Sequence, residues 1–263
     1  MTTFSGAKVL LTGASSGIGE ALAVELAKRG AKLVLLARRE AELERVRKLC
    51  ARPDDHAVEP VDLSDADKLV AKGKELLAKH GPFDLVIHNA GITQRAFVHE
   101  TELAIDRKLL EVNFFAPVAL TRALLPSMLE RKKGHIVVVS SVAGYVGTRR
   151  RSAYSGSKHA LRGWFDALRA EVFDQGLHVT IVCPGYVRTP ISENAIGADG
   201  ARHGVMDAGQ ANGMSPEECA RRILRGVEKQ QSELTMGGKE TLIIPLKRFL
   251  PGLTERIIRK VNT

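Results

Sequence analysis

Short apolar runs alternate with longer helical patterns along most of this chain, and this alternation constrains the fold more than any other feature. Each run is rich in Val, Ile and Leu, as strands buried on both faces require. We expect strands at 8–12, 32–37, 56–61, 85–88, 136–140, 179–183 and 233–236. The pattern therefore predicts an α/β fold, a doubly wound parallel sheet of about seven strands with helices on both faces.

The helical patterns fill the stretches between these strands, and no linker marks a second domain. The clearest helices are expected over 18–29, up to about residue 49, over 103–129 and over 153–174. Pro117 and Pro126 are expected to kink or divide the third of these. Five glycines break any regular period in 191–213, and so long a connection is typical of a mobile substrate lid. We interpret 1–263 as a single domain.

The turn after the first expected strand, 12–19, carries glycines with separate structural uses. Gly13 permits a tight turn, Gly17 lets the backbone approach a pyrophosphate, and Gly19 allows the next helix to pack closely on the strand. The helix N-terminus then presents unpaired N–H groups and a partial positive charge to an anion. The turn predicts a dinucleotide site whose contacts are Gly13, Ser15, Ser16, Gly17, Ile18 and Gly19.

The glycine spacing in this turn is Gly-x-x-x-Gly-x-Gly, which differs from the Gly-x-Gly-x-x-Gly of the common dinucleotide fold. It resembles the cofactor signature of the short-chain dehydrogenase/reductase family, and the resemblance continues in order over roughly the first 190 residues. It includes Asp62, 88–91, Asn113, Ser141, Tyr154, Lys158 and 184–185. The resemblance implies a Rossmann-like fold, a nicotinamide cofactor, and a homodimer or homotetramer built partly on the helix of Tyr154.

The end of the second expected strand indicates which nicotinamide dinucleotide the chain binds. An acid there hydrogen-bonds an adenosine ribose, whereas a 2′-phosphate needs cations. Ala37 stands where NAD-binding relatives carry the acid, and Arg38 and Arg39 follow it. Because a guanidinium suits a bidentate phosphate contact, NADP(H) is the expected cofactor. The alternative, above all for Arg39, is a structural role at the start of a surface helix.

The resemblance implies further cofactor contacts after the later strands. Asp62 matches the family aspartate that accepts a hydrogen bond from the adenine amino group, with Leu63 beside the ring; from the residues alone, Asp62 is an N-cap of the next helix. The other implied contacts are Asn89, Ala90, Gly91, Pro184, Gly185, Val187 and Thr189. The family usually has asparagine at position 88, and His88 is expected to be a packed strand residue.

Tyr154 and Lys158 stand four residues apart, which places the phenol and the ammonium on one face of a helix. A nearby cation lowers the pKa of a phenol toward neutrality, where general acid–base catalysis is most effective. The resemblance implies that Ser141 holds the substrate oxygen and that Asn113 holds a water linking Lys158 to solvent. Adjacent Ser140 competes with Ser141, and strand alternation allows only one of them to face the site.

These residues predict an NADP(H)-dependent oxidoreductase that moves hydride between the nicotinamide and a carbonyl or secondary-alcohol carbon. Tyr154 and Lys158 are also expected to contact the cofactor, and Ser141, Tyr154 and Tyr186 the substrate. Apolar residues near the site favour a hydrophobic ketone of lipid, steroid or acyl type, and the reduced cellular NADP pool favours its reduction. The alternative is a non-catalytic NADP(H)-binding sensor or scaffold.

Charge, cysteine and histidine content narrow the expected partners. The formal charge of +9 comes from basic residues spread along the chain without interleaved aromatics, so no specific nucleic-acid partner is expected. Three arginines at 149–151 offer a site for an anionic carrier, although a solvated loop is the favoured interpretation. Three widely spaced cysteines and eight histidines predict neither a disulfide framework nor a metal site, and they favour a reducing, cytoplasmic location.

The last segment, 240–263, mixes large apolar residues with cations and extends beyond small members of the family. Three placements are open for this basic amphipathic extension. It covers the substrate pocket of its own chain, packs on a neighbouring subunit, or lies on an anionic membrane as an interfacial segment. No stretch of the sequence has the consecutive apolar residues of a membrane span. We therefore expect a cytoplasmic protein, with membrane-peripheral attachment through this segment as the open alternative.

Overall fold

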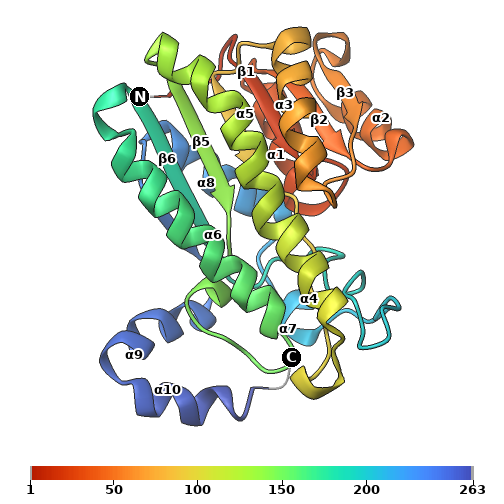
Figure 1. Cartoon of the computed structure of the whole chain (residues 1–263), viewed down its shortest axis with the longest axis vertical. Helices are drawn as coiled ribbons and strands as arrows, with labels where there is room; N and C mark the ends of the chain where they lie inside the picture. The colour runs from red at the N-terminus through yellow and green to blue at the C-terminus, as the bar shows by residue number, and fades with distance from the viewer. Residues whose placement is uncertain (1, 262–263) are drawn as a thin grey trace.

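In the computed structural model, which describes residues 2–261, seven strands form one sheet in the order β3-β2-β1-β4-β5-β6-β7 (Figure 1). The strands are β1 Lys8–Thr12, β2 Lys32–Ala37, β3 Ala57–Pro60, β4 Leu85–His88, β5 Gly134–Val139, β6 Leu177–Pro184 and β7 Glu233–Met236. All neighbouring strands pair in parallel. The doubly wound, Rossmann-like sheet predicted from the apolar runs is confirmed, with the expected bounds for β1, β2, β4 and β7.

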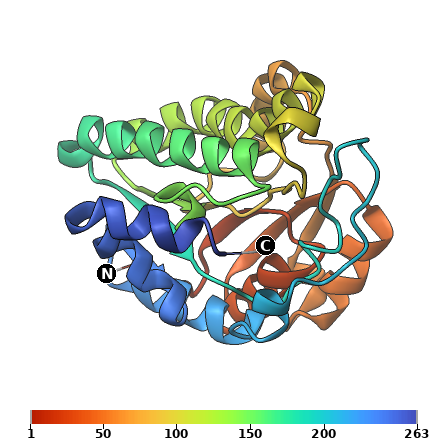
Figure 2. The same cartoon turned by 90° about the horizontal axis from the view of Figure 1, so that it is seen from below.

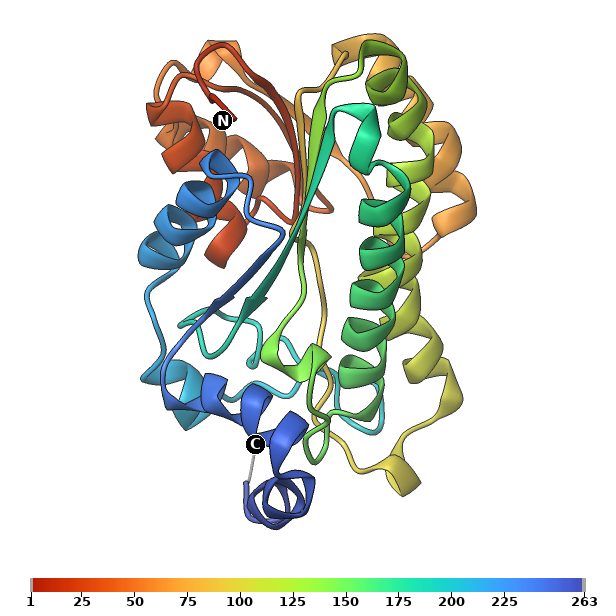
Figure 3. The ribbon, with the colours of Figure 1, turned by 90° about the vertical axis from the view of Figure 1, so that its left-hand side faces the viewer.

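Helices cover the sheet on both faces, and Figure 3 shows the sheet between two helical layers. The α-helices are α1 Gly17–Lys28, α2 Glu40–Leu49, α3 Ala66–His80, α4 Leu103–Leu110, α5 Ala116–Arg131, α6 Ser152–Glu171, α7 Ala208–Ala211, α8 Pro216–Glu228, α9 Ile243–Phe249 and α10 Pro251–Ile258. Side chains of α1, α2 and α8 pack in one hydrophobic cluster, and those of α3, α5 and α6 pack in another. Each face of the sheet therefore has its own core.

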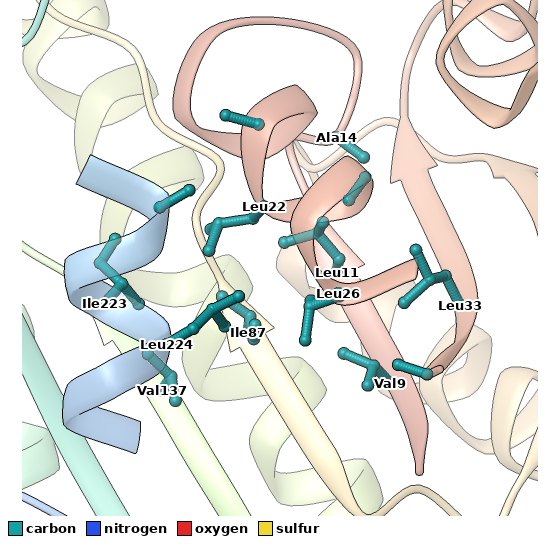
Figure 4. Close-up of a cluster of buried hydrophobic side chains, with 14 of the residues drawn as sticks. Val9, Leu11, Ala14, Leu22, Leu26, Leu33, Ile87, Val137, Ile223 and Leu224 are labelled. Atoms are coloured by element: carbon teal, nitrogen blue, oxygen red, sulfur yellow. The ribbon is translucent and has the colours of Figure 1, made fainter. Parts of the chain in front are cut away.

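The first core fixes the strand and helix on either side of the glycine turn (Figure 4). Val9 and Leu11 project from β1 to the same face of the sheet because strand side chains alternate. Leu22 and Leu26, one turn apart on α1, meet them, and Leu224 of α8 closes the cluster. All five side chains are completely buried, and each contributes about 1.5–3 kcal/mol by leaving water.

The helical run over 103–131 changes geometry at its centre. Between α4 and α5, Glu111–Phe115 form a wide π-helical turn, and Pro117 then stands in the first turn of α5, where a missing N–H costs little. By length and mean hydropathy the run qualifies as a membrane span, yet 56% of its most apolar window is buried inside the fold. A core helix of a globular domain has these same properties. The wide turn brings Asn113 into the interior.

The loops after β4, β5, β6 and β7 emerge at the carboxyl edge of the sheet, where open α/β sheets bind their ligands. Figure 2, seen from this edge, shows α9 and α10 on the left and much of the 191–213 segment on the right. That segment contains α7 and is anchored to the loop after β4, where the Ile196 N–H donates to the Thr93 carbonyl at 2.9 Å. Its mobility as a lid stays a prediction.

Candidate active site

The glycine turn joins β1 to α1 in a conformation that requires glycine at particular positions. Gly13 and Gly17 have φ angles of +67° and +58°, in the left-handed region that favours glycine. A Cβ on Gly19 would lie 2.0 Å from the Gly13 carbonyl oxygen, so a larger residue has no room there. Ser16 precedes α1 and its side chain makes no capping hydrogen bond. The N-terminus of α1 is therefore available to an anion such as a pyrophosphate.

The end of β4 braces this turn from behind. Asn89 Nδ2 donates to the carbonyl oxygens of Thr12 and Gly13, each at 3.2 Å. Thr12 Oγ1 accepts from the N–H groups of Asn89 and Ala90, each at 3.1 Å. His88 is the packed histidine that was expected, because its Nε2 lies 2.8 Å from a buried threonine hydroxyl and burial lowers its pKa to about 3. The contact of Asn89 with cofactor stays a prediction.

The arginines after β2 differ in their surroundings. Both side chains are exposed, and among residues 2–261 Arg38 has no hydrogen-bonded or ion-paired partner. Arg39 is the N-cap residue of α2, where its carbonyl accepts from the Leu43 N–H at 3.2 Å. The Arg39 backbone therefore holds the structural position that was its alternative. Neither guanidinium has a hydrogen bond or ion pair among residues 2–261, so both are open to a phosphate.

Asp62 does not have the structural role that its position after β3 indicated. Its Oδ1 accepts from the Ser64 N–H at 3.0 Å, and the N-cap of α3 is Asp65, which accepts from the Lys68 N–H. The interpretation of Asp62 as a helix cap is therefore wrong, because three residues of turn separate it from α3. Asp62 is exposed and Leu63 beside it is buried. Their contacts with adenine stay predictions.

Tyr154 and Lys158 lie on the first two turns of α6, directly beyond the carboxyl edge. Lys158 Nζ is 5.9 Å from the centre of the Tyr154 ring, so the four-residue spacing brings the ammonium to the phenol. The Lys158 side chain is buried, and its Nζ donates to the Val139 carbonyl oxygen at 2.8 Å. Burial lowers the pKa of Lys158 to about 8. Its proton is therefore exchangeable near neutral pH.

The two serines after β5 have different environments. Ser140 is buried, and its hydroxyl donates to the Lys158 carbonyl oxygen at 3.1 Å. Ser141 is partly exposed, accepting from the Ala143 N–H at 3.1 Å and lying 3.5 Å from the Pro184 carbonyl oxygen. Ser140 is thus used within the fold, and the hydroxyl of Ser141 lies between the loops after β5 and β6.

Asn113 joins the loop after β4 to α6. Its Oδ1 accepts from the Ile92 N–H at 2.8 Å, and its Nδ2 donates to the Ile92 carbonyl at 2.9 Å and to Ser157 Oγ at 3.0 Å. A Cβ on Gly91 would lie 3.2 Å from Asn113 Oδ1 and 3.4 Å from Lys158 Nζ, so the three residues meet at one point. The water that Asn113 is expected to hold between Lys158 and solvent stays a prediction.

A buried ionic network beside Tyr154 was not predicted from the sequence. Gln94 Oε1 accepts from the Tyr154 N–H at 3.2 Å, which connects this network to α6. The Arg95 side chain is 0% exposed and pairs with Asp207, which also accepts from Arg151 Nη2 at 3.1 Å. Burial opposes the charge on Asp207, but hydrogen bonds and the charges of both arginines lower its pKa. The network ties the 191–213 segment to the start of α6.

The segment after β6 runs past the glycine turn. The Thr189 methyl would lie 3.0 Å from a Cβ on Gly17, and Val187 pairs with Met214. Glu240, also missed by sequence reasoning, supports this segment because its Oε1 accepts from the Tyr186 N–H at 2.9 Å. Pro184 is the last residue of β6, and Gly185 connects it to Tyr186.

A hollow of about 520 Å³ opens beside Tyr186, lined also by Gly209, Gly213, Gly237 and Glu240. Neither Ser141 nor Tyr154 lines it, so this hollow is distinct from the cluster of acid–base residues. Within residues 2–261 no group of three His, Cys, Asp or Glu side chains is placed to hold a metal ion.

Comparisons with known proteins agree with this geometry. The family described as short chain dehydrogenase matches residues 7–199. A relative from Anopheles gambiae, named dehydrogenase/reductase SDR family protein 7-like, is 44% identical over 238 residues, which are 88% of this chain and 75% of that protein.

Two solved structures share the fold over nearly all of their length. A short-chain dehydrogenase from Streptomyces avermitilis has a TM-score of 0.81 at 30% identity, covering 98% of this chain and 100% of that one. A metagenomic short-chain oxidoreductase in complex with NADP has a TM-score of 0.72 at 30% identity, covering 89% of this chain and 98% of that one.

Proposed function

This chain belongs to the short-chain dehydrogenase family, an oxidoreductase family that uses a nicotinamide cofactor, and on that premise we propose that it uses NADPH to reduce a hydrophobic ketone. The observation that carries the proposal is the proximity of Lys158 Nζ to the Tyr154 ring, 5.9 Å from its centre, together with the partly exposed Ser141 after β5. The apolar segments expected near these residues favour a hydrophobic substrate. The catalytic residues are Asn113, Ser141, Tyr154 and Lys158.

In the proposed reaction, Tyr154 donates its phenolic proton to the carbonyl oxygen of the ketone. Ser141 donates a hydrogen bond to the same oxygen, and the Lys158 ammonium stabilises the phenolate that forms. The chemistry that bound NADPH supplies is a hydride for the carbonyl carbon. Lys158 then returns a proton to Tyr154 and takes one up from solvent, an exchange that its pKa of about 8 permits at neutral pH.

The glycine turn fits the cofactor because Gly13 and Gly17 adopt left-handed φ angles and the N-terminus of α1 lacks a side-chain cap. The proposal of NADP(H) rather than NAD(H) rests on Arg38, which is exposed after β2 without a protein partner in 2–261. The NADP complex of the metagenomic relative supports the same cofactor. The proposed contacts also include Ala90, Gly91 and the 184–189 segment.

Replacement of Arg38 tests the cofactor preference. Arg38→Ala is expected to weaken NADPH binding about 10- to 100-fold and leave NADH binding unchanged, because a charge-assisted phosphate contact contributes about 1.5–3 kcal/mol. Fluorescence titration with both dinucleotides measures this change. Arg39→Ala is the matched control, since Arg39 caps α2 through its backbone. Equal losses for NADPH and NADH in Arg38→Ala would contradict the assignment.

Replacement of Tyr154 tests the reaction. With a panel of hydrophobic ketones, wild-type protein is expected to oxidise NADPH, and Tyr154→Phe to lose about 10²- to 10⁴-fold in kcat with NADPH binding retained. The readouts are absorbance of NADPH and a fluorescence titration of the same variant. Cofactor binding by the wild type without turnover of any ketone would instead indicate the sensor or scaffold role.

Assembly and compartment are also part of the proposal. We infer from the family resemblance a homodimer or homotetramer built partly on α6, which size-exclusion chromatography with light scattering measures. The three cysteines are buried and unpaired, and burial raises the pKa of Cys50 and Cys183 to about 11, which suits a reducing compartment such as the cytoplasm.

A further inference from the structure

Most of the large apolar side chains that the fold leaves exposed lie at one end of the molecule. Eleven are exposed in residues 2–261, and eight of them lie at 98–103, at 205 and within 242–257, in connections that follow strands β4, β6 and β7. These eight are Val98, Leu103, Val205, Leu242, Phe249, Leu250, Leu253 and Ile257. Single exposed apolar residues are ordinary on a protein surface, whereas five within 242–257 form a concentration that indicates a contact.

The same short segment is strongly basic. Five cations and one acid lie within 242–260, and the cations Lys247, Arg248, Arg256, Arg259 and Lys260 are all exposed. Their neighbours Phe249 and Leu250 are exposed as well, at 75% and 54%. Large apolar side chains interleaved with cations are typical of segments that lie at the boundary between lipid headgroups and acyl chains.

The segment is held beside the active site. Lys247 Nζ donates to the Tyr145 carbonyl oxygen at 2.8 Å, and Arg149 Nη1 donates to the Arg259 carbonyl oxygen at 3.4 Å. Tyr145 and Arg149 lie between Ser141 and Tyr154 in the chain, so α9 and α10 contact the loop that separates the two proposed catalytic residues. Figures 1 and 3 show both helices beyond the carboxyl edge of the sheet.

These contacts decide among the three placements considered for the extension. The extension does touch a loop of its own chain, but its large apolar side chains stay exposed, so covering the pocket does not account for them. A two-fold interface between copies would bring two such basic segments together, and like charges across an interface repel. An anionic lipid surface satisfies both the apolar side chains and the cations.

We propose that α9 and α10 dock this protein on an anionic phospholipid membrane, with its active-site edge facing the bilayer. Leu103 at the start of α4, and Val98 and Val205 in the connections after β4 and β6, are also exposed and extend the docking surface. The inference rests on the proposed function and narrows its substrate to a ketone dissolved in the membrane. Such a substrate reaches Ser141 and Tyr154 from the lipid without crossing water.

Vesicle sedimentation with the purified full chain tests the docking surface. Wild-type protein is expected to sediment with vesicles of phosphatidylcholine and phosphatidylglycerol, and at least tenfold less with phosphatidylcholine alone. The double variant Phe249→Glu/Leu253→Glu is expected to lose at least tenfold in binding to the anionic vesicles. Phe173→Glu is the matched control, because Phe173 is 76% exposed just after the C-terminal end of α6 and its replacement is expected to leave binding intact.

Three outcomes would overturn the docking surface. They are absence of wild-type binding to anionic vesicles, equal binding by the double variant, and dissociation of an oligomer by the double variant with vesicle binding unchanged. The last assigns the surface to a second copy of the chain. Light scattering measures the oligomer, and circular dichroism establishes that each variant is folded.

Turnover of a water-soluble ketone without vesicles separates this inference from the proposed function. Wild type and double variant are expected to turn over such a ketone equally, because Phe249 and Leu253 lie outside the acid–base cluster. If the wild type turns over the ketone but does not bind anionic vesicles, only the proposed docking surface is wrong. If the wild type binds vesicles but turns over no ketone, the proposed function is wrong and the proposed docking surface stands.

Discussion

The proposed cofactor side and the proposed substrate side of the carboxyl edge are held by different kinds of contact. On the cofactor side, left-handed φ angles at Gly13 and Gly17 and hydrogen bonds from the Asn89 side-chain amide to main-chain carbonyl oxygens fix the glycine turn. On the substrate side, the 191–213 segment is tied down by the pair Arg95 and Asp207, which are 112 residues apart. The first side depends on main-chain geometry, and the second depends on buried charge.

This difference teaches which substitutions each side tolerates. A turn fixed by backbone geometry is disturbed by a single added methyl group, because its neighbours are other backbone atoms that cannot move aside. A loop fixed by buried ion pairs is disturbed by loss of one charge, which leaves its partner desolvated and unpaired. Cofactor binding and substrate binding are therefore expected to respond to separate variants. A change at Lys158, where the two sides meet and which is itself expected to contact the cofactor, is expected to lower turnover far more than it weakens either binding step.

The largest expected effect is at Lys158 itself. Lys158→Met removes the ammonium that stabilises the phenolate of Tyr154, and kcat for ketone reduction is expected to fall about 10²- to 10⁴-fold. Steady-state kinetics measures this loss, and titration with NADPH and with ketone measures binding. If the variant loses NADPH affinity by as large a factor as kcat, Lys158 acts only in cofactor binding, and it is not the residue where the two sides meet.

The second effect tests the cofactor side. Gly19→Ala places a Cβ 2.0 Å from the Gly13 carbonyl oxygen, and the resulting strain of about 1–3 kcal/mol is expected to weaken NADPH binding about 10- to 100-fold. Titration of NADPH and thermal unfolding measure it. Gly163→Ala is the control, since a Cβ there meets nothing within 4 Å.

The control variant Gly163→Ala is itself expected to change the Tm. Gly163 lies inside α6, where alanine is favoured over glycine by about 0.5–1 kcal/mol, so Gly163→Ala is expected to raise Tm with NADPH binding unchanged. Unchanged NADPH affinity in Gly19→Ala would show that the turn relaxes, against the view that its backbone is fixed.

The same difference determines what could be predicted from the sequence. The glycine turn, the Tyr154 and Lys158 pair and the bounds of β1, β2, β4 and β7 follow from local spacing, because a strand alternates every two residues and a helix repeats every 3.6. Ser141 was identified by its interval to Tyr154, and the partly exposed position of its hydroxyl agrees with that choice. The family and the fold could thus be predicted from short segments.

The substrate side could not be predicted in this way. The contact of Arg95 with Asp207 joins residues 112 apart, so no local pattern marks it, and Asp207 lies in a segment that showed no period. The helix cap after β3 was misassigned to Asp62 because two aspartates, at 62 and 65, precede the same helix and both are good caps. Side-chain partners of this kind need the tertiary structure.

The third effect tests the substrate side. Asp207→Asn keeps the shape of the side chain but leaves the Arg95 and Arg151 guanidinium groups without a carboxylate, and KM for ketone is expected to rise about tenfold while the Kd for NADPH stays unchanged. Kinetics with varied ketone and a cofactor titration separate the two constants. Glu193→Gln, in the same segment but paired only with exposed Arg202 at 3.8 Å, is the control. If Asp207→Asn raises the Kd for NADPH by the same factor as the KM for ketone, cofactor binding and substrate binding do not depend on separate contacts.

The smallest effect is a dependence on pH that originates where the two sides meet. Burial lowers the pKa of Lys158 to about 8, so the ammonium form predominates below pH 8 and the neutral amine above it. Ketone reduction needs the ammonium to stabilise the phenolate, so kcat is expected to be near its maximum at pH 6–7, about half of it at pH 8, and to fall further as the pH rises. The Lys158→Arg variant keeps its charge throughout this range, and its kcat is expected not to fall between pH 7 and 9. If the kcat of the wild type is constant from pH 7 to 9, bound cofactor keeps Lys158 charged. The cofactor side would then determine the protonation state of the residue that serves the substrate side.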